Sequence, residues 1–481
     1  MRRPSTARST GFALSVALAC ALAACGGGAA VSTATGSWPH VDWTRFGFTA
    51  SRTSVGPAST GITAANVSAL RRRQVRLGGT VDSSPIYLHG ITIRGARHDA
   101  FFVTTTYGRT EAIDADRGSV LWRYTPPGYA GWAGSYRITT ATPVADPSRA
   151  WIYAASPDGR IQKLAVADGR AAWRTRITLL PEREKIASAL NYSRGRVIAT
   201  TGGYLGDAPP YQGHVAVLAA ASGRVLHVWN SLCSERRHLQ APASCPRSDS
   251  AMWGRAGAVV EPRTGNLLVA TGNGFWDGRR FWGDSALKLS ADATRLLGNW
   301  TPTNQAELDS SDADLGSTAP ALLGGRFLLQ GGKDGKLRLL SLARMNGTRH
   351  AGPRTGGELQ TVETPGGADL FTAPAVQGSL VFLADNSGTA AWELRGGRLH
   401  RLWENGSAGT SPVVAGGLLY VYDPSGGLRV YAPRSGRLVA NLPAGSGHWN
   451  SPIVVDGRVA LAEGDANDHE QLGVLDIWRL P

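Results

Sequence analysis

Asn273, a residue whose side chain can bind a metal ion, lies between two glycines in VATGNGFWDG (residues 269–278). The apolar residues before it predict a buried strand that ends at this point. An amide oxygen at a strand end is a hard ligand that suits calcium. An asparagine between glycines is equally typical of a turn. The residue types alone leave both interpretations of Asn273 open.

Other chemistry-bearing motifs are few. The segment GDANDHE at 464–470 alternates oxygen ligands as calcium loops do, but it lacks the spacing of an EF-hand loop, so a solvated turn is the better interpretation. The mature sequence contains no serine-nucleophile motif, phosphate-binding loop, zinc signature or CxxCH haem motif. Any oxidation carried out by this chain would therefore need an external electron acceptor.

A repeated unit must position these residues. Each copy has a short alternating strand, a turn usually built on glycine, and a second strand that often ends in tryptophan, and glycine suits the positive φ of a tight hairpin. The copies lie at 110–124, 161–175, 215–229, 285–300, 337–347, 389–403 and 428–442, with a truncated copy at 472–481. We expect the tryptophans to be wedges between units: Trp122, Trp173, Trp229, Trp300 and Trp403.

Upstream of most copies is a motif of small residues followed by proline. It reads SSP at 83–85, ATP at 141–143, TAP at 318–320 and 372–374, TSP at 410–412 and NSP at 450–452. Four strands per unit, spaced roughly forty residues apart, predict an all-β, eight-bladed β-propeller. Because the last copy has one strand, we expect residues 41–48 (VDWTRFGF) to close the ring beside VLDIWRL, which removes exposed sheet edges.

The N-terminus predicts export and a lipid anchor. Arginines precede an uncharged apolar run from Gly11 to Ala24, which is too short to span a bilayer and reads as a secretory signal. The following LAAC resembles the bacterial lipobox, which implies that Cys25 is lipidated; an ordinary signal peptide with an incidental Cys25 is the alternative. We predict a signal at 1–24, a flexible tether at 25–40 and the propeller at 41–481, anchored in the cell envelope and facing the periplasm or the exterior.

Two cysteines, Cys233 and Cys245, remain after Cys20 leaves with the signal and Cys25 takes lipid. Outside the reducing cytosol such a pair should form a disulfide that staples a polar surface loop. A metal pair is the competing interpretation, but neither a CxxC nor a nearby pair of histidines completes such a site.

The chain is basic, with a formal charge of +14, which falls to +11 without the three signal arginines. The arginines are scattered apart from Arg71, Arg72 and Arg73, with no basic helix or stacking platform, so nucleic acid is not an expected partner. The excess charge favours an envelope protein, an anionic envelope polymer or lipid headgroups as partners, and we expect a monomer.

The spacing of glycine and tryptophan with three residues between them, in DRGSVLW and ADGRAAW, resembles the pyrroloquinoline quinone (PQQ) repeat. The resemblance covers about residues 42–481. Two kinds of protein share this repeat: quinoprotein alcohol dehydrogenases, and enzymatically silent lipoproteins such as the scaffold of outer-membrane β-barrel assembly. The repeat therefore implies a fold without implying a chemistry.

In the dehydrogenases, the resemblance implies a quinone at the central axis, a calcium ion at its carbonyl and a carboxylate base. VATGNG matches the strand end that gives an asparagine to calcium, which is Asn273 here. SSDADLGSTAP at 310–320 resembles the segment of the base, so that Asp312 or Asp314 takes this role. GGKDGKL at 331–337 resembles the turn that offers the quinone a cation, here Lys333.

Other parts of the pattern depart from the dehydrogenases. Only Asp207 lies near the place of the second metal ligand, a glutamate in the family, and Arg255 stands where an aromatic floor is expected, with Trp253 two residues away. Asn273 could simply turn the chain, and Lys333 could pair with Asp312 or Asp314. We therefore expect a binding or scaffold module, with a PQQ- and calcium-dependent alcohol or sugar dehydrogenase as the alternative.

The lipobox generates a first prediction. Replacing Cys25 with serine should release the mature protein from membranes, because the predicted anchor is the acyl chains on that cysteine. Fractionation of cells after a high-salt wash, which removes electrostatic association, measures this release. Retention of Cys25→Ser in the washed membranes would contradict the lipobox interpretation.

Overall fold

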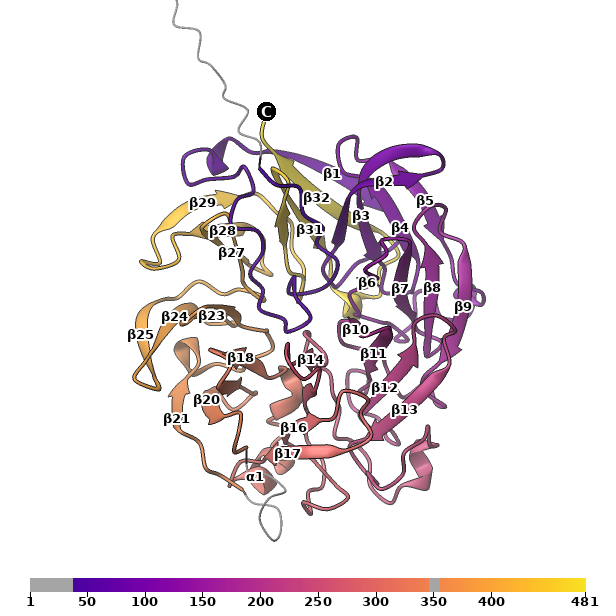
Figure 1. Cartoon of the computed structure of the whole chain (residues 1–481), viewed down its shortest axis with the longest axis vertical. Helices are drawn as coiled ribbons and strands as arrows, with labels where there is room; N and C mark the ends of the chain where they lie inside the picture. The colour runs from indigo at the N-terminus through magenta and orange to yellow at the C-terminus, as the bar shows by residue number, and fades with distance from the viewer. Residues whose placement is uncertain (1–37, 346–354) are drawn as a thin grey trace, which may run out of the picture. The chain divides into compact units, whose positions relative to one another are not determined.

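The computed structural model describes residues 38–345 and 355–481. The predicted signal and Cys25 lie outside the described residues. Within the unit Trp38–Pro481, these residues form eight four-stranded antiparallel sheets, which are the blades of a β-propeller (Figure 1). The prediction of an eight-bladed, all-β propeller is confirmed.

Seven blades follow the chain order, with the first strand of each innermost. Blades 1 to 3 are β2 (Ile86–Ile93), β3 (Ala96–Thr104), β4 (Thr110–Asp114) and β5 (Val120–Tyr124); β6 (Val144–Ala145), β7 (Trp151–Ser156), β8 (Arg160–Ala165) and β9 (Ala171–Arg176); and β10 (Asn191–Ser193), β11 (Arg196–Thr200), β12 (His214–Ala219) and β13 (Val225–Asn230). Blades 4 and 5 are β14 (Val259–Val260), β15 (Leu267–Ala270), β16 (Ala286–Leu289) and β17 (Leu296–Trp300); and β18 (Ala321–Leu323), β19 (Phe327–Gln330), β20 (Lys336–Ser341) and β21 (Gln360–Glu363).

The remaining blades complete the ring. Blades 6 and 7 are β22 (Ala375–Gln377), β23 (Leu380–Ala384), β24 (Thr389–Arg395) and β25 (Arg398–Asn405); and β26 (Val413–Ala415), β27 (Leu418–Tyr422), β28 (Leu428–Tyr431) and β29 (Leu438–Leu442). Blade 8 has the order β1 (Arg71–Leu77), β32 (Gly473–Arg479), β31 (Arg458–Glu463) and β30 (Ile453–Val455). A short helix, α1 (Gln305–Ser310), and 3₁₀ turns at Val67–Ala69, Tyr129–Gly131, Pro242–Ser244, Leu315–Ser317, Pro365–Gly367 and Ala466–Asp468 lie between strands.

The strand that closes the ring is β1, so the prediction that residues 41–48 pair beside VLDIWRL is wrong. β1 runs antiparallel to β32, with Arg71 opposite Arg479 and Leu77 opposite Gly473. Its arginines leave too few apolar residues for the alternating pattern that predicts a strand. They nevertheless suit an outermost strand, because charge discourages pairing with another sheet. Arg72 also lies 2.7 Å from carboxylate oxygens of both Asp476 and Glu463 of the same blade.

Residues 43–56, which we call the axial segment, instead cross one end of the ring (Figure 1). Trp43 pairs with Tyr87 of β2, and Thr44, Ala50, Thr53 and Ser54 accept backbone hydrogen bonds of 2.8–3.0 Å from the innermost strands of blades 2, 4, 6 and 7. The buried Arg52 donates to the carbonyl oxygens of Phe46 and Leu190. The axial segment therefore blocks the axis at the ends of the innermost strands.

The small-residue segments that precede the innermost strands join every blade to the next. In the order of the blades, the bonds of this collar are Ser84 N to Thr142 Oγ1, Thr140 Oγ1 to Ala187 O, Ser188 Oγ to Met252 O, Gly254 N to Gly316 O, Thr318 Oγ1 to Thr372 O, Ala373 N to Ser411 Oγ, Thr410 Oγ1 to Asn450 O and Asn450 Nδ2 to Val81 O. Short hydroxyl side chains satisfy buried carbonyl oxygens here, which explains the repeated serine and threonine before proline.

The tryptophans act as wedges, and they also explain the glycines of the repeat. Each of three indole rings lies against the turn glycine of the next blade, where an added Cβ would lie 2.5–2.6 Å from the ring, and donates to a backbone carbonyl beside that turn. The pairs are Trp122 with Gly169, Trp173 with Gly223 and Trp403 with Gly436. The glycine is thus needed for close approach as well as for its positive φ.

The disulfide prediction is confirmed. Cys233 and Cys245 are bonded, with a Cα to Cα distance of 6.1 Å. The bridge closes the loop that follows β13, and both cysteines pack with Leu232 and Phe281.

Candidate functional site

A cavity of about 950 Å³ lies on the axis, lined by the segments that lead into the innermost strands rather than by the axial segment. Six lining residues share one position, four residues before an innermost strand: Asp82, Thr140, Ala187, Arg255, Phe371 and Trp449. Turns between the second and third strands of blades 3, 4 and 5 complete the wall. Cavities of this size are typical of small-molecule sites.

The structure brings the sequence-predicted residues together in this axial pocket. Its lining includes all six of the residues proposed for the base, cofactor and metal: Asp207, Trp253, Asn273, Asp312, Asp314 and Lys333. They come from blades 3, 4 and 5 and from the segments between these blades. Their meeting follows from the ring, because equivalent turns of successive blades face the same axis.

Asn273 links two neighbouring segments of the wall. Its backbone N–H donates to Asp314 Oδ1 at 2.9 Å, and its side-chain Nδ2 donates to Asp312 Oδ1 at 2.8 Å. Gly272 must be a glycine for this contact, since a Cβ there would lie 1.9 Å from Asp314 Oδ1. The TGNG motif therefore ties the β15–β16 loop to the segment that follows α1.

Lys333 lies between the two aspartates. Its Nζ is 2.6 Å from Asp314 Oδ2 and 3.2 Å from Asp312 Oδ1. Burial opposes the charge of Lys333, but Asp314 and Asp312 outweigh burial and raise its pKa. Lys333 is thus an ammonium at neutral pH, while burial raises the pKa of Asp314 against the opposing effect of Lys333.

The residues around Asn273 do not fit a calcium ion. Both oxygens of Asp314 are engaged by Lys333 and by the Asn273 N–H, and the Asn273 amide presents its NH₂ to Asp312. Asp207, expected near the second ligand position, accepts a hydrogen bond of 2.7 Å from the Tyr211 hydroxyl. Calcium needs six to eight oxygen ligands, and an ammonium already neutralises the carboxylates here.

Arg255 does not form a floor of the pocket, because its guanidinium pairs with Asp82. Asp82 is buried, lies 3.0 Å from Arg255 Nη2 and also lies 2.8 Å from His448 Nδ1. Burial raises the pKa of Asp82, but Arg255 and His448 outweigh burial and hold it below its usual range. The aromatic lining on this part of the wall is Trp253, two residues before Arg255.

Sequence reasoning missed many residues of the pocket, among them Lys185, Phe371, His448 and Trp449. Phe371 lies between two indole rings, with its centroid 5.9 Å from Trp253 and 4.7 Å from Trp449. These three rings form what we call the aromatic wall. A signal was present, since Phe371 and Trp449 each directly precede a small-residue-plus-proline motif, but only the ring shows that this position faces the axis.

Lys185 differs from Lys333 because no described carboxylate forms an ion pair with it, although Asp82, Asp207 and Asp465 favour its charge from farther away. Among residues 38–345 and 355–481, no carboxylate oxygen lies within 4.0 Å of its Nζ. Burial, and then the charge of Arg255, lower the pKa of Lys185 to about 8. Lys185 is therefore an amine of the pocket that changes charge near neutral pH.

The pocket is acidic although the protein is basic. Its lining carries six aspartates against Lys185, Arg255 and Lys333. Burial and the nearby Asp207 raise the pKa of Asp249, which shows that the carboxylates crowd one another. The lining therefore disfavours a strongly anionic ligand.

Eight four-stranded blades around an axial pocket, built from this repeat, define a PQQ-repeat β-propeller. The sequence matches the family described as "Outer membrane protein assembly factor BamB" over residues 63–241 and 283–439. The chain belongs to this family.

The chain is also similar to a polyvinylalcohol dehydrogenase of Pseudomonas sp., with 22% identity over 211 residues. The match covers 41% of this chain and 32% of that protein, so the chain corresponds to about a third of the dehydrogenase.

Solved structures share the fold. A quinohemoprotein alcohol dehydrogenase from Comamonas testosteroni has a TM-score of 0.68 and 16% identity, covering 91% of this chain and 80% of its own. A europium-containing methanol dehydrogenase has a TM-score of 0.67 and 16% identity, covering 91% and 98%. BamB from Moraxella catarrhalis has a TM-score of 0.53 and 14% identity, covering 85% and 98%. At these identities the likeness establishes the fold alone.

In the part of the chain that the structure describes, no helix is long and apolar enough to span a membrane.

The two pocket lysines generate a second prediction. Trace acetylation followed by mass spectrometry should show Lys185 reacting with a midpoint near pH 8, because only the neutral amine is nucleophilic and its pKa is about 8. Lys333 is the internal control, since its raised pKa keeps it charged and unreactive in the same range. If both lysines titrated together above pH 10, the described environment of Lys185 would be wrong.

Proposed function

We propose that this chain is a binding module of the cell envelope whose axial pocket takes a hydroxyl-rich ligand, such as a sugar or a polyol. The observation that carries the proposal is the aromatic wall beside unpaired hydrogen-bonding groups in one pocket. Flat rings pack against the C–H faces of a sugar or polyol, while carboxylates accept hydrogen bonds from its hydroxyl groups.

The charge of the pocket supports a neutral ligand. Three of its aspartates are already paired, Asp82 with Arg255, and Asp312 and Asp314 with Lys333. The second oxygen of Asp312 makes none of these contacts, and the side chain is 64% exposed. A hydroxyl group that donates to this oxygen adds no charge, whereas an anionic group would meet excess negative charge.

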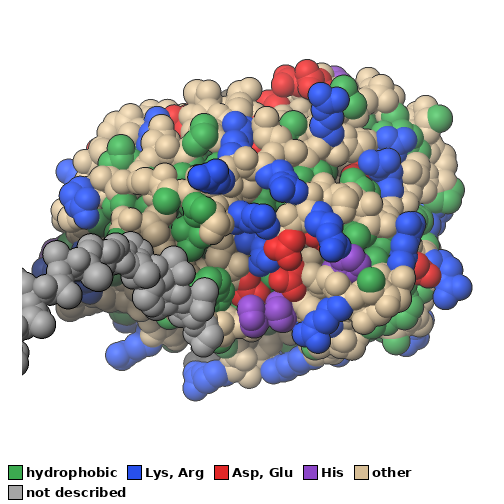
Figure 2. Space-filling view, turned by 90° about the horizontal axis from the view of Figure 1, so that it is seen from above, with side chains coloured by type: hydrophobic (Ala, Val, Ile, Leu, Met, Phe, Trp, Pro, Cys, Tyr) green, Lys and Arg blue, Asp and Glu red, His purple; other side chains and the backbone are tan. Residues whose placement is uncertain are grey.

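Envelope placement is the second part of the proposal. It rests on the lipobox at Cys25 and on membership of the assembly-factor family. Lysine and arginine side chains are scattered over the face shown in Figure 2, which suits contact with an anionic envelope polymer or with an envelope protein. We propose that the lipid holds the monomeric propeller at a membrane while the ring stays free to bind.

A dehydrogenase is the second candidate function, and one observation favours it. Asp312 and Asp314 line the same pocket as the ligand-binding rings, and a carboxylate with a free oxygen can take a proton from an alcohol. Asp312 is the better base, because both oxygens of Asp314 are engaged. The relative named for polyvinyl alcohol also acts on a hydroxyl-rich polymer.

The aromatic wall generates a third prediction. Titration with maltotriose and with polyvinyl alcohol, followed by tryptophan fluorescence and calorimetry, should give saturable binding to at least one of them. Phe371→Ala should weaken this binding about 30-fold, since truncating a central aromatic anchor costs about 2 kcal/mol. Tyr136→Ala is the matched control, because Tyr136 is an exposed ring outside the pocket lining. Equal binding by wild type and Phe371→Ala would contradict the proposal.

The poor fit of calcium to the residues around Asn273 generates a fourth prediction. Adding PQQ and calcium to the wild-type protein should produce neither a calcium-dependent quinone absorption band nor dye-linked alcohol oxidation, because Lys333 neutralises the carboxylates that calcium would need. Asn273→Ala should then change stability by only about 1 kcal/mol through lost hydrogen bonds.

The opposite outcome would favour the dehydrogenase. A quinone band that appears with calcium in the wild type and vanishes in Asn273→Ala would overturn the binding-module proposal. Asp312→Asn would then identify the base, since it should retain the band and lose turnover.

A further inference from the structure

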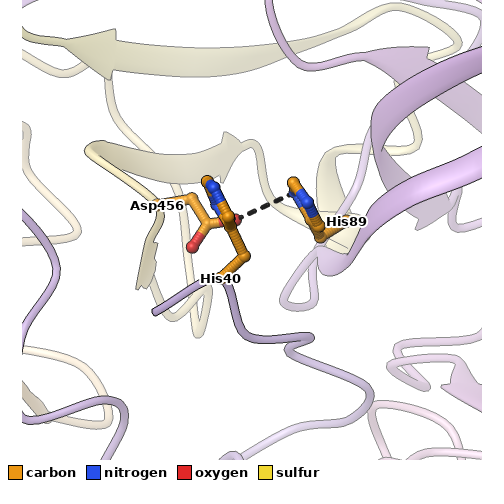
Figure 3. A group of neighbouring side chains, drawn as sticks. All are labelled: His40, His89 and Asp456. Atoms are coloured by element: carbon orange, nitrogen blue, oxygen red, sulfur yellow. Dashed lines mark hydrogen bonds and ion pairs between the residues drawn. The ribbon is translucent and has the colours of Figure 1, made fainter. Parts of the chain in front are cut away.

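A group of side chains of metal-ligating types lies outside the axial pocket (Figure 3). His40 precedes the axial segment, His89 is on β2 of blade 1, and Asp456 is in the turn between β30 and β31 of blade 8. Their potential ligand atoms all lie within 4.8 Å of one another. The face shown in Figure 2 carries two adjacent histidines beside acidic side chains.

The distances match those between ligands of one small metal ion. His40 Nδ1 and His89 Nδ1 lie 3.2 and 3.4 Å from the same oxygen, Asp456 Oδ2. Zinc binds imidazole nitrogen and carboxylate oxygen at about 2.0–2.2 Å, which places tetrahedral ligands about 3.3–3.5 Å apart. We propose that His40, His89 and Asp456 form a zinc site, with water in the fourth position.

The surroundings prepare two of the three ligands. Asp456 is buried, and its Oδ2 accepts a hydrogen bond of 2.9 Å from the Tyr87 hydroxyl, which fixes the carboxylate. His89 Nδ1 is buried without a correctly oriented hydrogen-bond partner, although an oxygen of Asp99 lies 2.9 Å away. A metal ion would satisfy this nitrogen.

His40 is the ligand that must adjust. Its ring is stacked on His89, with centroids 4.0 Å apart and planes 4° apart, so the two Nδ1 lone pairs lie in separate, nearly parallel planes. Convergence on one ion requires the His40 ring to turn. The His40 side chain is 56% exposed, and its carboxylate partner among the described residues is Asp456 itself, so the rotation gives up the stack on His89 but keeps His40 beside its partner.

The charges around the group permit a cation. Arg458 faces it but pairs with two other carboxylates, Asp99 at 3.3 Å and Asp116 at 2.5 Å. Arg149 pairs with Asp42 at 2.7 Å. The other three-residue group in the described chain, Asp82 with His448 and Asp465, is less suitable because Arg255 already neutralises its buried carboxylate.

The position of the site gives zinc a structural role. Its ligands come from blade 1, from blade 8 and from the chain that enters the axial segment, so one ion would join all three where the ring closes. Zinc would thereby hold residues 38–42 against blades 1 and 8. This role is independent of the ligand in the axial pocket.

Zinc titration of the chelator-treated, full-length mature protein tests the site. Calorimetry should show one tight equivalent in the wild type, and zinc should raise Tm and slow hydrogen exchange in residues 38–46. His40→Gln and His89→Gln should each raise the Kd at least about 100-fold, since losing even a supporting group of a zinc site costs about 10–100-fold. His40 is exposed, so its variant should fold normally.

Two control variants distinguish the outcomes. His98→Gln removes a histidine whose carboxylate partner in the described part of the chain is Asp114, and His448→Gln disrupts the other candidate group. Both variants should keep the zinc equivalent. Absence of zinc binding in the wild type, or binding unchanged by His40→Gln and His89→Gln, would overturn the proposal. Loss of zinc in His448→Gln alone would also overturn it by placing the ion in the axial pocket.

Discussion

Pairing of β1 with β32 is the interaction on which the rest of the structure depends. Each blade of a propeller buries its faces only against its two neighbours, so a gap between blades 8 and 1 would expose both of their apolar faces. A strand that precedes blade 1 in the chain completes blade 8, and this joins the two ends of the fold. The collar of hydrogen bonds then joins the segments that precede the innermost strands around the whole ring.

That closure creates the pocket. The collar brings the residue four positions before the innermost strand to the pocket in six of the eight blades. The axial segment blocks the opposite end with backbone hydrogen bonds to strands of several blades. The result is a cavity closed at one end, whose wall comes from short loops that can vary independently of the blades. Such a scaffold can carry different sites, as the names of its relatives, an assembly factor and several dehydrogenases, illustrate.

Within the pocket, the chemistry depends on where Lys333 lies. Because it bridges Asp312 and Asp314, the region that resembles a catalytic site is internally neutralised, and Asn273 serves to connect the two strand-end segments. Lys185 and the aromatic wall remain available to a ligand. The pocket therefore offers stacking surfaces and hydrogen bonds rather than a cation site.

The sequence by itself determined the blade, its count of eight, the tryptophan wedges and the disulfide, because these depend on local periodicity and on residue types that recur in each copy. It also identified Asn273, Asp312, Asp314 and Lys333 as neighbours through their resemblance to one family. Tertiary structure alone decided that the arginine-rich β1 closes the ring, that Trp43 and its neighbours cross the axis, and that Phe371, Trp449 and Lys185 share a pocket. The reason is physical: pattern within a segment reports which face of a strand is buried, whereas contacts between segments hundreds of residues apart depend on ring closure, which no local pattern encodes.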